Sequence, residues 1–206
     1  SSSTRGIQAG GWVSSSPAHD TNVIQYVELM TKGNSLDFGD LTDTRRSMAG
    51  ANSPTRGLFA GGEKNTPSVY ITQIEQITIA AKGNATNFGD MIFRKRFDVQ
   101  TISNSTRGIF AGHGYGTNRK EIEYVNIASQ GNGTVFGDLS QLRQGCSGAA
   151  SPIRGIVASG TNPSFTGLVE SVIISTTGNA TYFGDLNMAR RYSTGISDCH
   201  GGLGGF

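Results

Sequence analysis

Two short cassettes recur in step along the whole chain, and this regularity limits the possible folds more than any other feature. The first is an Arg-Gly pair with a short run of apolar and small residues ending in glycine; its arginines are Arg5, Arg56, Arg107 and Arg154. A degraded copy starts at Cys199, and the successive spacings are 51, 51, 47 and 46 residues. The second cassette is Gly-Asn followed by Phe-Gly-Asp, with aspartates Asp40, Asp90, Asp138 and Asp185. A period of about 40 to 50 residues predicts β-propeller blades.

The composition agrees with an all-β fold. The 206 residues include 30 glycines and only 16% charged residues, which suits many short strands joined by tight turns. We find no convincing helix pattern and no apolar run of the roughly 18 residues that a membrane span needs. The net charge of +2 is too small to indicate a nucleic-acid surface. The basic trio at 94–96 is interpreted as a solvated start of a strand.

Each repeat divides into four expected strands. In the second unit these are residues 45–52, 56–61, 71–80 and 85–88, the last one ended by Gly89 and Asp90. Alternation in the third strand puts Ile74 on a mostly polar face with Thr72 and Gln76, and Glu75 on the other face. The Gly83-Asn84 pair is typical of a hairpin turn. Four antiparallel strands make one propeller blade.

The arginine before a small-residue strand, the Gly-Gly end of the next strand and a third strand around Ile-Glu-Tyr-Val resemble the kelch repeat. In the second unit the matching residues are Arg45, Ala49, Gly61-Gly62 and Ile74-Glu75. The repeats depart from the kelch pattern in the last strand, where phenylalanine replaces the usual tryptophan. The two cassettes together resemble repeats in virion-associated proteins of tailed phages, especially marine ones. The resemblance implies a propeller of kelch-like blades in a virion appendage.

We expect a single propeller domain over residues 1–206, with repeats at about 4–54, 55–105, 106–152 and 153–198 and a further repeat starting at 199–206. Residues 4–40 and 189–198 are expected to combine into one blade that closes a four-bladed ring. The alternatives are an excerpt of a larger ring and a ring completed by another chain. Because the chain opens on Ser1 in the middle of a repeat, we interpret it as a processed product or a piece of a longer polypeptide. Cys146 and Cys199 are interpreted as free thiols in the core, although a disulfide between them stays open.

The cassette residues are interpreted as structural. Residues that recur in every repeat usually hold the blades together, the arginine through carbonyls or the aspartate, and the aspartate by capping a turn. The phenylalanines are expected to pack between neighbouring blades. The alternative is a ring of ligand-binding residues, because equivalent positions of all blades line one face.

The loops between the second and third strands vary in length and chemistry, and all should emerge on one face. Each carries an aromatic residue among small polar ones, as many binding surfaces do. The candidate binding residues are Trp12, His19, Tyr70, Tyr115, Arg119 and Phe165. The three histidines have no spacing suited to a shared metal, no paired carboxylates stand out beyond the repeated ones, and no sialidase-type Ser-x-Asp-x-Gly-x-Thr-Trp box occurs. We therefore expect no metal, no cofactor and no catalysis.

These observations predict a non-enzymatic structural or binding module of a phage virion appendage. Its inter-strand loops would contact a neighbouring virion protein or a host-surface receptor, with a host glycan as one candidate ligand. Many weak contacts would be multiplied by the valency of the particle. The alternative is a bacterial surface or secreted lectin-like adhesin. Both place the protein on a virion or outside the cell, as part of a larger assembly and without nucleic acid or membrane insertion.

Overall fold

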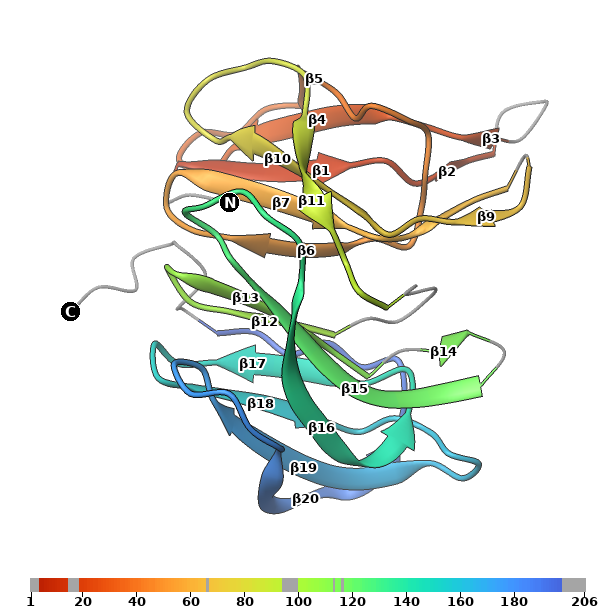
Figure 1. Cartoon of the computed structure of the whole chain (residues 1–206). Coiled ribbons are helices and arrows are strands. Elements are labelled where there is room, and N and C mark those ends of the chain that lie inside the picture. Colours follow the sequence, from red (N-terminus) through yellow and green to blue (C-terminus); the bar gives the residue numbers. More distant parts are fainter. Residues whose placement is uncertain are drawn as a thin grey trace.

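The computed structural model describes residues 4–14, 19–65, 67–93, 100–112, 114–115 and 117–197, and these residues form strands and turns without a helix. Four small antiparallel sheets are arranged as the four blades of a β-propeller (Figure 1). The basic trio at 94–96 and the residues from Cys199 onward lie outside the described residues. No helix that could span a membrane occurs in the described part of the chain.

The strands follow the repeat. Blade 1 contains β1 (Arg5–Ala9), β4 (Val23–Glu28) and β5 (Leu36–Asp40), and blade 2 contains β6 (Ala49–Asn52), β7 (Arg56–Ala60), β10 (Gln73–Thr78) and β11 (Thr86–Asp90). Blade 3 contains β12 (Gln100–Ser103), β13 (Arg107–Ala111), β15 (Thr117–Asn126) and β16 (Thr134–Arg143), and blade 4 contains β17 (Ser147–Ala150), β18 (Arg154–Ala158), β19 (Thr166–Ile173) and β20 (Thr181–Arg190). The short strands β2 (Trp12–Val13), β3 (His19–Asp20), β8 (Glu63–Lys64), β9 (Val69–Tyr70) and β14 (Gly114–Tyr115) form extensions between the second and third strands of blades 1 to 3.

The core lies between the blades rather than within them. Three buried clusters join blade 1 to blade 2, blade 2 to blade 3, and blade 3 to blade 4. Phe38, Phe88 and Phe136 belong to these three clusters, and each is at most 3% exposed. Ile74, placed by alternation on a mostly polar face, is fully buried because that face packs on blade 3. Cys146 is also buried, in the cluster between blades 3 and 4.

The outer strand of every blade carries a β-bulge that the sequence pattern did not reveal. In blade 2, Ile74 pairs with Gly89 but Glu75 pairs with Asn87, so Phe88 is the extra residue. The same slip surrounds Phe38, Phe136 and Phe183. The extra residue of a bulge is left out of the ladder. The sequence pattern predicted that this strand ends at Phe88, but β11 continues past the bulge through Gly89 to Asp90.

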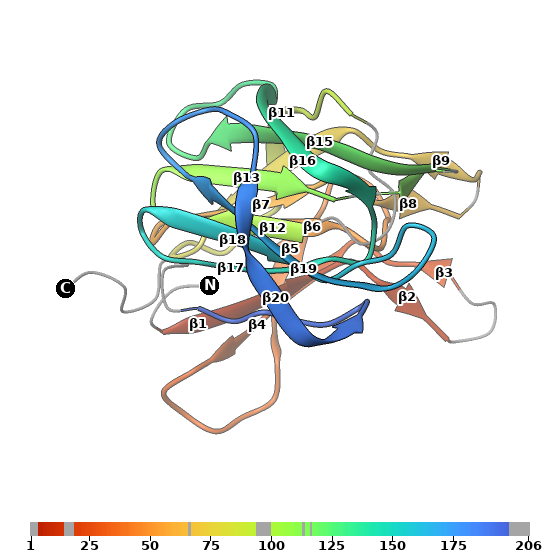
Figure 2. The same ribbon diagram turned by 90° about the horizontal axis from the view of Figure 1, so that it is seen from below.

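Among the described residues blade 1 has three strands, and the segment expected to be its fourth lies beside another blade. Seen from below, β2, β3, β8 and β9 lie together at one end of the molecule (Figure 2). The segment 189–198 was expected to complete blade 1, but its described part contacts β17: the hydroxyl of Ser197 accepts a hydrogen bond from the N–H of Ala150 at 3.2 Å. Within the described residues β1 forms a ladder with β4 alone. The structure thus differs here from the expected closed ring.

Candidate functional site

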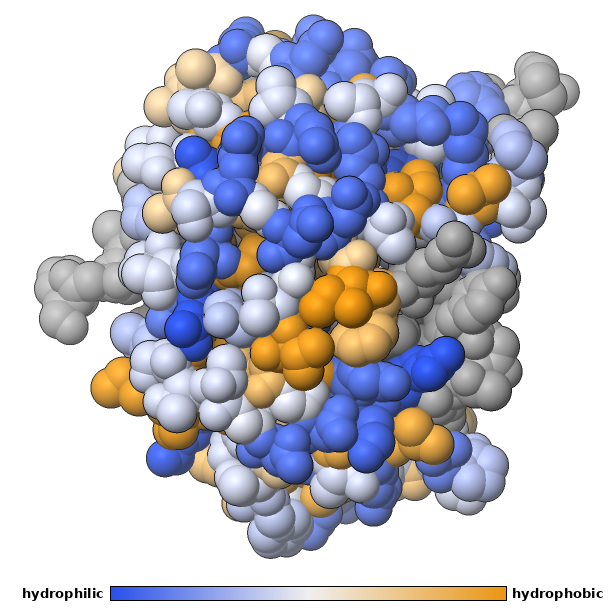
Figure 3. Space-filling view, viewed as in Figure 1, coloured by the Kyte–Doolittle hydropathy of each residue, from blue (hydrophilic) through white to orange (hydrophobic). Residues whose placement is uncertain are grey.

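The extensions of blades 1 to 3 project on the same side of the molecule (Figure 1). In the space-filling view, the edge near β2 and β9 shows small apolar groups among hydrophilic ones (Figure 3). Val13 and Val69, in these two strands, are 37% and 45% exposed. We call this side, formed by β2, β3, β8, β9 and β14, the hairpin side.

Trp12 is held in place on the hairpin side by an arginine from the start of blade 2. The guanidinium of Arg46 lies 4.7 Å from the centre of the Trp12 ring. The same guanidinium pairs with Asp20 at 2.9 Å and with Glu63 at 2.8 Å. Asp20 comes from β3 and Glu63 from β8, so the arginine joins the extensions of blades 1 and 2.

The charges of this cluster are well matched. Asp20 and Glu63 are buried, whereas the Trp12 side of the cluster is open, with Trp12 46% exposed. Desolvation lowers the pKa of Arg46, but hydrogen bonds to Asp20 and Glu63 outweigh it and raise the pKa above its ordinary value. The arginine therefore stays charged, and its contact with the ring is of the cation–π type. We call this half-exposed ring, stacked on the ion-paired arginine, the Trp12 platform.

A second ion pair holds the β8–β9 extension of blade 2. The Nζ of Lys64 lies 2.7 Å from a carboxylate oxygen of Asp43. The hydrogen bond from Lys64 is the main reason why the pKa of Asp43 is below its ordinary value. The N–H of Asn65 donates to the other carboxylate oxygen of Asp20 at 2.6 Å. The β8 extension is thus tied to both blades 1 and 2.

The other candidate residues are spread over the hairpin side without meeting in one site. His19 is exposed on the same hairpin as Trp12, and Tyr70 is half-buried on β9. Arg119 forms a partly exposed ion pair with Glu121 at 3.5 Å. Phe165, 55% exposed, belongs to blade 4 and contacts the guanidinium of Arg191. Tyr115 lies on β14, and its side chain is outside the described part of the chain.

The cassette residues lie at the junctions between blades. The guanidinium of Arg56 donates to the carbonyl of Ile127 in the next blade at 2.6 Å, and Arg107 does the same to Ile174 at 2.8 Å. Arg5 donates to the carbonyls of Ile79 and Ala80. Each of these three arginines therefore ties its blade to the end of the third strand of the next blade, whereas the guanidinium of Arg154 lies 5.7 Å from the centre of the Phe183 ring in its own blade.

The bulge supplies the rest of each junction. Phe38, left out of the ladder, accepts a hydrogen bond at its carbonyl from the N–H of Gly83 at 2.9 Å. Next to it, the N–H of Asp40 donates to the side chain of Asn84 at 3.0 Å, and the Asp40 carbonyl accepts from Ala85. The same three bonds join 88–90 to 131–133 and 136–138 to 178–180. Phe-Gly-Asp of one blade thus binds the Gly-Asn turn of the next through main-chain groups of the aspartate.

Sequence reasoning missed the buried glutamates of the third strands. Glu75, Glu123 and Glu170 are at most 1% exposed, and each accepts a hydrogen bond from a backbone N–H of the preceding blade. Glu75 pairs with the buried Arg45 at 2.6 Å, and Glu170 pairs with the buried Arg143 at 2.5 Å. Their recurrence with the repeat period was a readable signal. In blade 1 the equivalent residue is Gln25.

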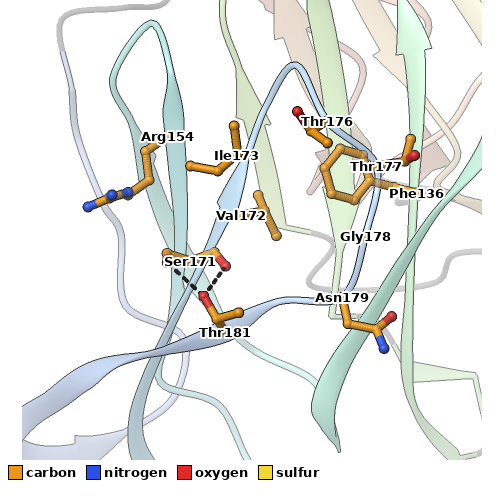
Figure 4. A pocket seen from close by; sticks show the side chains of 10 residues that line it. All are labelled: Phe136, Arg154, Ser171, Val172, Ile173, Thr176, Thr177, Gly178, Asn179 and Thr181. Carbon is orange, nitrogen blue, oxygen red and sulfur yellow. Dashed lines mark hydrogen bonds between the residues drawn. The ribbon is translucent and has the colours of Figure 1, made fainter.

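A hollow of about 260 Å³ in blade 4 follows from the repeat as well. It lies between Arg154 and the turn that contains Gly178 and Asn179, with Ser171 and Thr181 on its floor (Figure 4). A hollow of about 240 Å³ occupies the equivalent place beside Arg56 and Asn84 in blade 2. At the position of Ser171, blades 1 and 3 carry Tyr26 and Tyr124, whose rings lie against Arg5 and Arg107. The hollows of blades 4 and 2 are therefore places where Ser171 and Gln76 replace the tyrosine of the other blades.

No group of three or more metal-ligating side chains occurs in the ranges that the structure describes. Comparisons with known proteins found neither a matching protein family nor a matching curated sequence. Among solved structures, one described as "Structure of YjhT" superimposes with a TM-score of 0.76 at 8% identity. The match covers 94% of this chain and 71% of that one. At this identity the likeness shows the propeller fold alone.

Proposed function

We propose that the protein is a non-enzymatic binding module, a kelch-like propeller of a virion appendage such as those of tailed phages. Its hairpin side is the contact surface for a neighbouring virion protein or a host-surface receptor. The observation that carries this proposal is the Trp12 platform: a half-exposed indole fixed by Arg46, which is itself fixed by two buried carboxylates.

The contrast between the two kinds of residue supports the proposal. The recurring arginines, asparagines and Phe-Gly-Asp segments serve the junctions, so they are occupied in holding blades together. The loops of the hairpin side differ from blade to blade in length and in the chemistry of their side chains. Binding residues are commonly placed on loops of a rigid scaffold. A preorganised aromatic residue also loses little conformational freedom on binding, which favours affinity.

A lectin-like adhesin is the second candidate, and one observation favours it. The Trp12 ring is 46% exposed on the β2–β3 hairpin, and its other neighbour is the ion-paired guanidinium of Arg46. An exposed aromatic ring on a fixed support can stack on the apolar face of a sugar. In this case the isolated protein would bind a glycan without any particle.

The test compares Trp12→Ala with Tyr182→Ala, which removes an aromatic residue from the outer strand of blade 4 that is even more exposed, 67% against 46%. Binding is measured to the purified source particle stripped of the protein, to host cells and to a glycan array. We expect Trp12→Ala to weaken one of these interactions at least tenfold, and Tyr182→Ala to leave it unchanged. Equal binding by both variants would refute the assignment of the contact surface. Binding confined to the array would select the adhesin.

A further inference from the structure

The hollow of blade 2 is separate from the hairpin side. Blade 2 has a described blade on each side, so the hollow does not belong to a blade at either end of the chain. β10 starts at Gln73, soon after the β8–β9 extension, and ends at Thr78, shortly before the Gly83-Asn84 turn. The extension and the turn lie at opposite ends of the blade (Figure 1). The hollow, which is lined by the turn, therefore lies away from the Trp12 platform.

In blades 1 and 3 a tyrosine occupies the place that is hollow in blade 2. The ring centres of Tyr26 and Tyr124 lie 5.0 Å and 4.6 Å from the guanidinium carbons of the cassette arginines of their blades. In blade 2 the equivalent residue is Gln76, and it lines a hollow of about 240 Å³ together with Arg56. The place beside this arginine is thus open to a group from outside the chain.

The guanidinium of Arg56 lacks the carboxylate that its equivalent in blade 1 has. Arg5 is paired in the ladder with Glu28, and their side chains form an ion pair at 3.3 Å. The residue paired with Arg56 is Thr78, which is neutral. Arg56 donates to the carbonyl of Ile127 and forms no ion pair within the described ranges. Because a guanidinium has five N–H donors, Arg56 can still donate to a ligand.

Lys82 adds a second positive charge to this hollow. It is exposed in the turn, and its Nζ lies 5.1 Å from the centre of the Tyr26 ring of blade 1. It too forms no ion pair in the part of the chain that the structure describes. At this position of the turn, blades 3 and 4 have the neutral residues Gln130 and Thr177. Of the four described blades, blade 2 is therefore the one that combines an open place with two cations that lack a carboxylate partner.

The other polar groups around the hollow are neutral. Thr78, Asn84 and Thr86 line it together with Gln76, and no carboxylate does. Among the described residues no hydrogen bond holds the side-chain oxygen of Gln76, so its amide can turn an N–H group toward a ligand. Uncompensated positive charge among neutral donors favours an anion. The volume is below the roughly 300 Å³ of pockets for drug-sized ligands, so it suits one small group.

We propose that the hollow of blade 2 binds a small oxyanion, that is, a carboxylate, sulfate or phosphate group. The guanidinium of Arg56 donates to its oxygens from the blade, and the ammonium group of Lys82 binds it from the rim. The hydroxyl groups of Thr78 and Thr86 complete the set of donors. The anion takes the place that Tyr26 has in blade 1, and it supplies the negative charge that Arg56 lacks.

This site is independent of the proposed function, which concerns the hairpin side at the other end of the blade. Its failure would therefore leave the binding function of the hairpin side untouched. The experiment is an NMR titration of the full, ¹⁵N-labelled chain with sodium acetate, sodium sulfate or sodium phosphate at pH 7. Sodium chloride keeps the ionic strength constant, so that general screening of charges does not change. The backbone amides of Gly83 and Thr86, at the hollow, report binding.

Two variants close the site in different ways. Gln76→Tyr fills the hollow with the residue that blades 1 and 3 have there. Thr78→Glu gives Arg56 the carboxylate that its equivalent in blade 1 has, and Thr78 is exposed, so this change is compatible with the fold. Lys32→Gln is the matched control, because Lys32 has the turn position of Lys82 in blade 1, where a tyrosine fills the place.

We expect at least one of the three anions to give saturating shifts at Gly83 and Thr86, in the unmodified chain and in Lys32→Gln alike. Saturation with acetate identifies a carboxylate site, and saturation with sulfate or phosphate identifies a site for tetrahedral anions. Gln76→Tyr and Thr78→Glu should each weaken binding at least about tenfold, the loss expected for one hydrogen bond to a charged group.

Three results would overturn the proposal. One is shifts that grow with concentration and never saturate for any of the three anions. Another is undiminished binding by Thr78→Glu, or by Gln76→Tyr with a folded spectrum. The third is a loss of binding in Lys32→Gln as large as in the two variants that close the site, since it would place the anion at blade 1.

Discussion

The buried pair of Arg143 and Glu170 allows the most quantitative prediction. The two side chains are 0% and 1% exposed and 2.5 Å apart. Glu170→Leu leaves the guanidinium with only carbonyl partners, those of Val157, Ser159 and Leu168, and removes the acceptor of the Ser140 N–H. Breaking a buried pair by removing one partner costs about 3–5 kcal/mol. For a chain of this size we therefore expect the melting temperature to fall by about 10 °C.

The control is Glu121→Leu, which breaks the pair of Arg119 and Glu121, whose side chains are 45% and 26% exposed. Partly exposed pairs contribute at most about 1 kcal/mol. Unfolding in urea is followed by circular dichroism for Glu170→Leu, for Glu121→Leu, for Arg143→Met, and for the double variant that combines Arg143→Met with Glu170→Leu. Because the residues are in contact, the double variant should cost about 2 kcal/mol less than the sum of the single changes. Equal losses for Glu170→Leu and Glu121→Leu, or strict additivity, would refute the reasoning.

Three further predictions rest on single contacts. Gly89→Ala should lower the free energy of unfolding by more than about 2 kcal/mol, because the φ of Gly89 is 157° and the new Cβ would lie 2.2 Å from the Gly131 carbonyl oxygen. Gly184→Ala, whose new Cβ would meet nothing within 4 Å, should change it by less than about 1 kcal/mol. Equal effects in urea unfolding would contradict the junction geometry. Lys64→Ala should raise the pKa of Asp43 toward 3.8, as measured by NMR titration of the carboxyl group. Since that pKa is lowered in the folded state, the contribution of Asp43 to stability is present above 3.8 and is lost as the pH falls through the folded pKa; an unchanged titration would contradict the ion pair. Arg46→Met should make the fluorescence of Trp12, the one tryptophan of the sequence, easier to quench with acrylamide, and unchanged quenching would contradict the stacking.

The sequence predicts the architecture well because the blade period is carried by two independent cassettes. It predicts less about the contacts, and the reasons are physical. The bulge at Phe88 cannot be read from alternation, since one extra residue leaves the pattern of its neighbours unchanged. The buried Glu75 was assigned to a face but not paired with Arg45, although both recur with the repeat.

The Trp12 platform depends on contacts that no local pattern reveals. Arg46 lies 34 positions after Trp12 and belongs to the next blade, so their stacking follows from the curvature of the propeller. The contact of Ser197 with β17 was equally hidden. A strand that looks as if it could close a ring gives no information about whether the ends of the chain reach each other. That depends on how far each blade is rotated from the previous one.

A side-chain-resolution cryo-EM reconstruction of the native source particle tests the central claim most directly. The claim is that the recurring cassettes hold blades together and that the hairpin side makes the contacts of the module. We predict that Asn84, Asn132 and Asn179 stay bonded to the preceding blades, and that the hairpin side with Trp12 faces a neighbouring protein or the free tip of an appendage. The account would be contradicted by partner density on the Gly-Asn turns or on Arg56 and Arg107, together with a hairpin side that faces the interior of the particle and contacts no other protein.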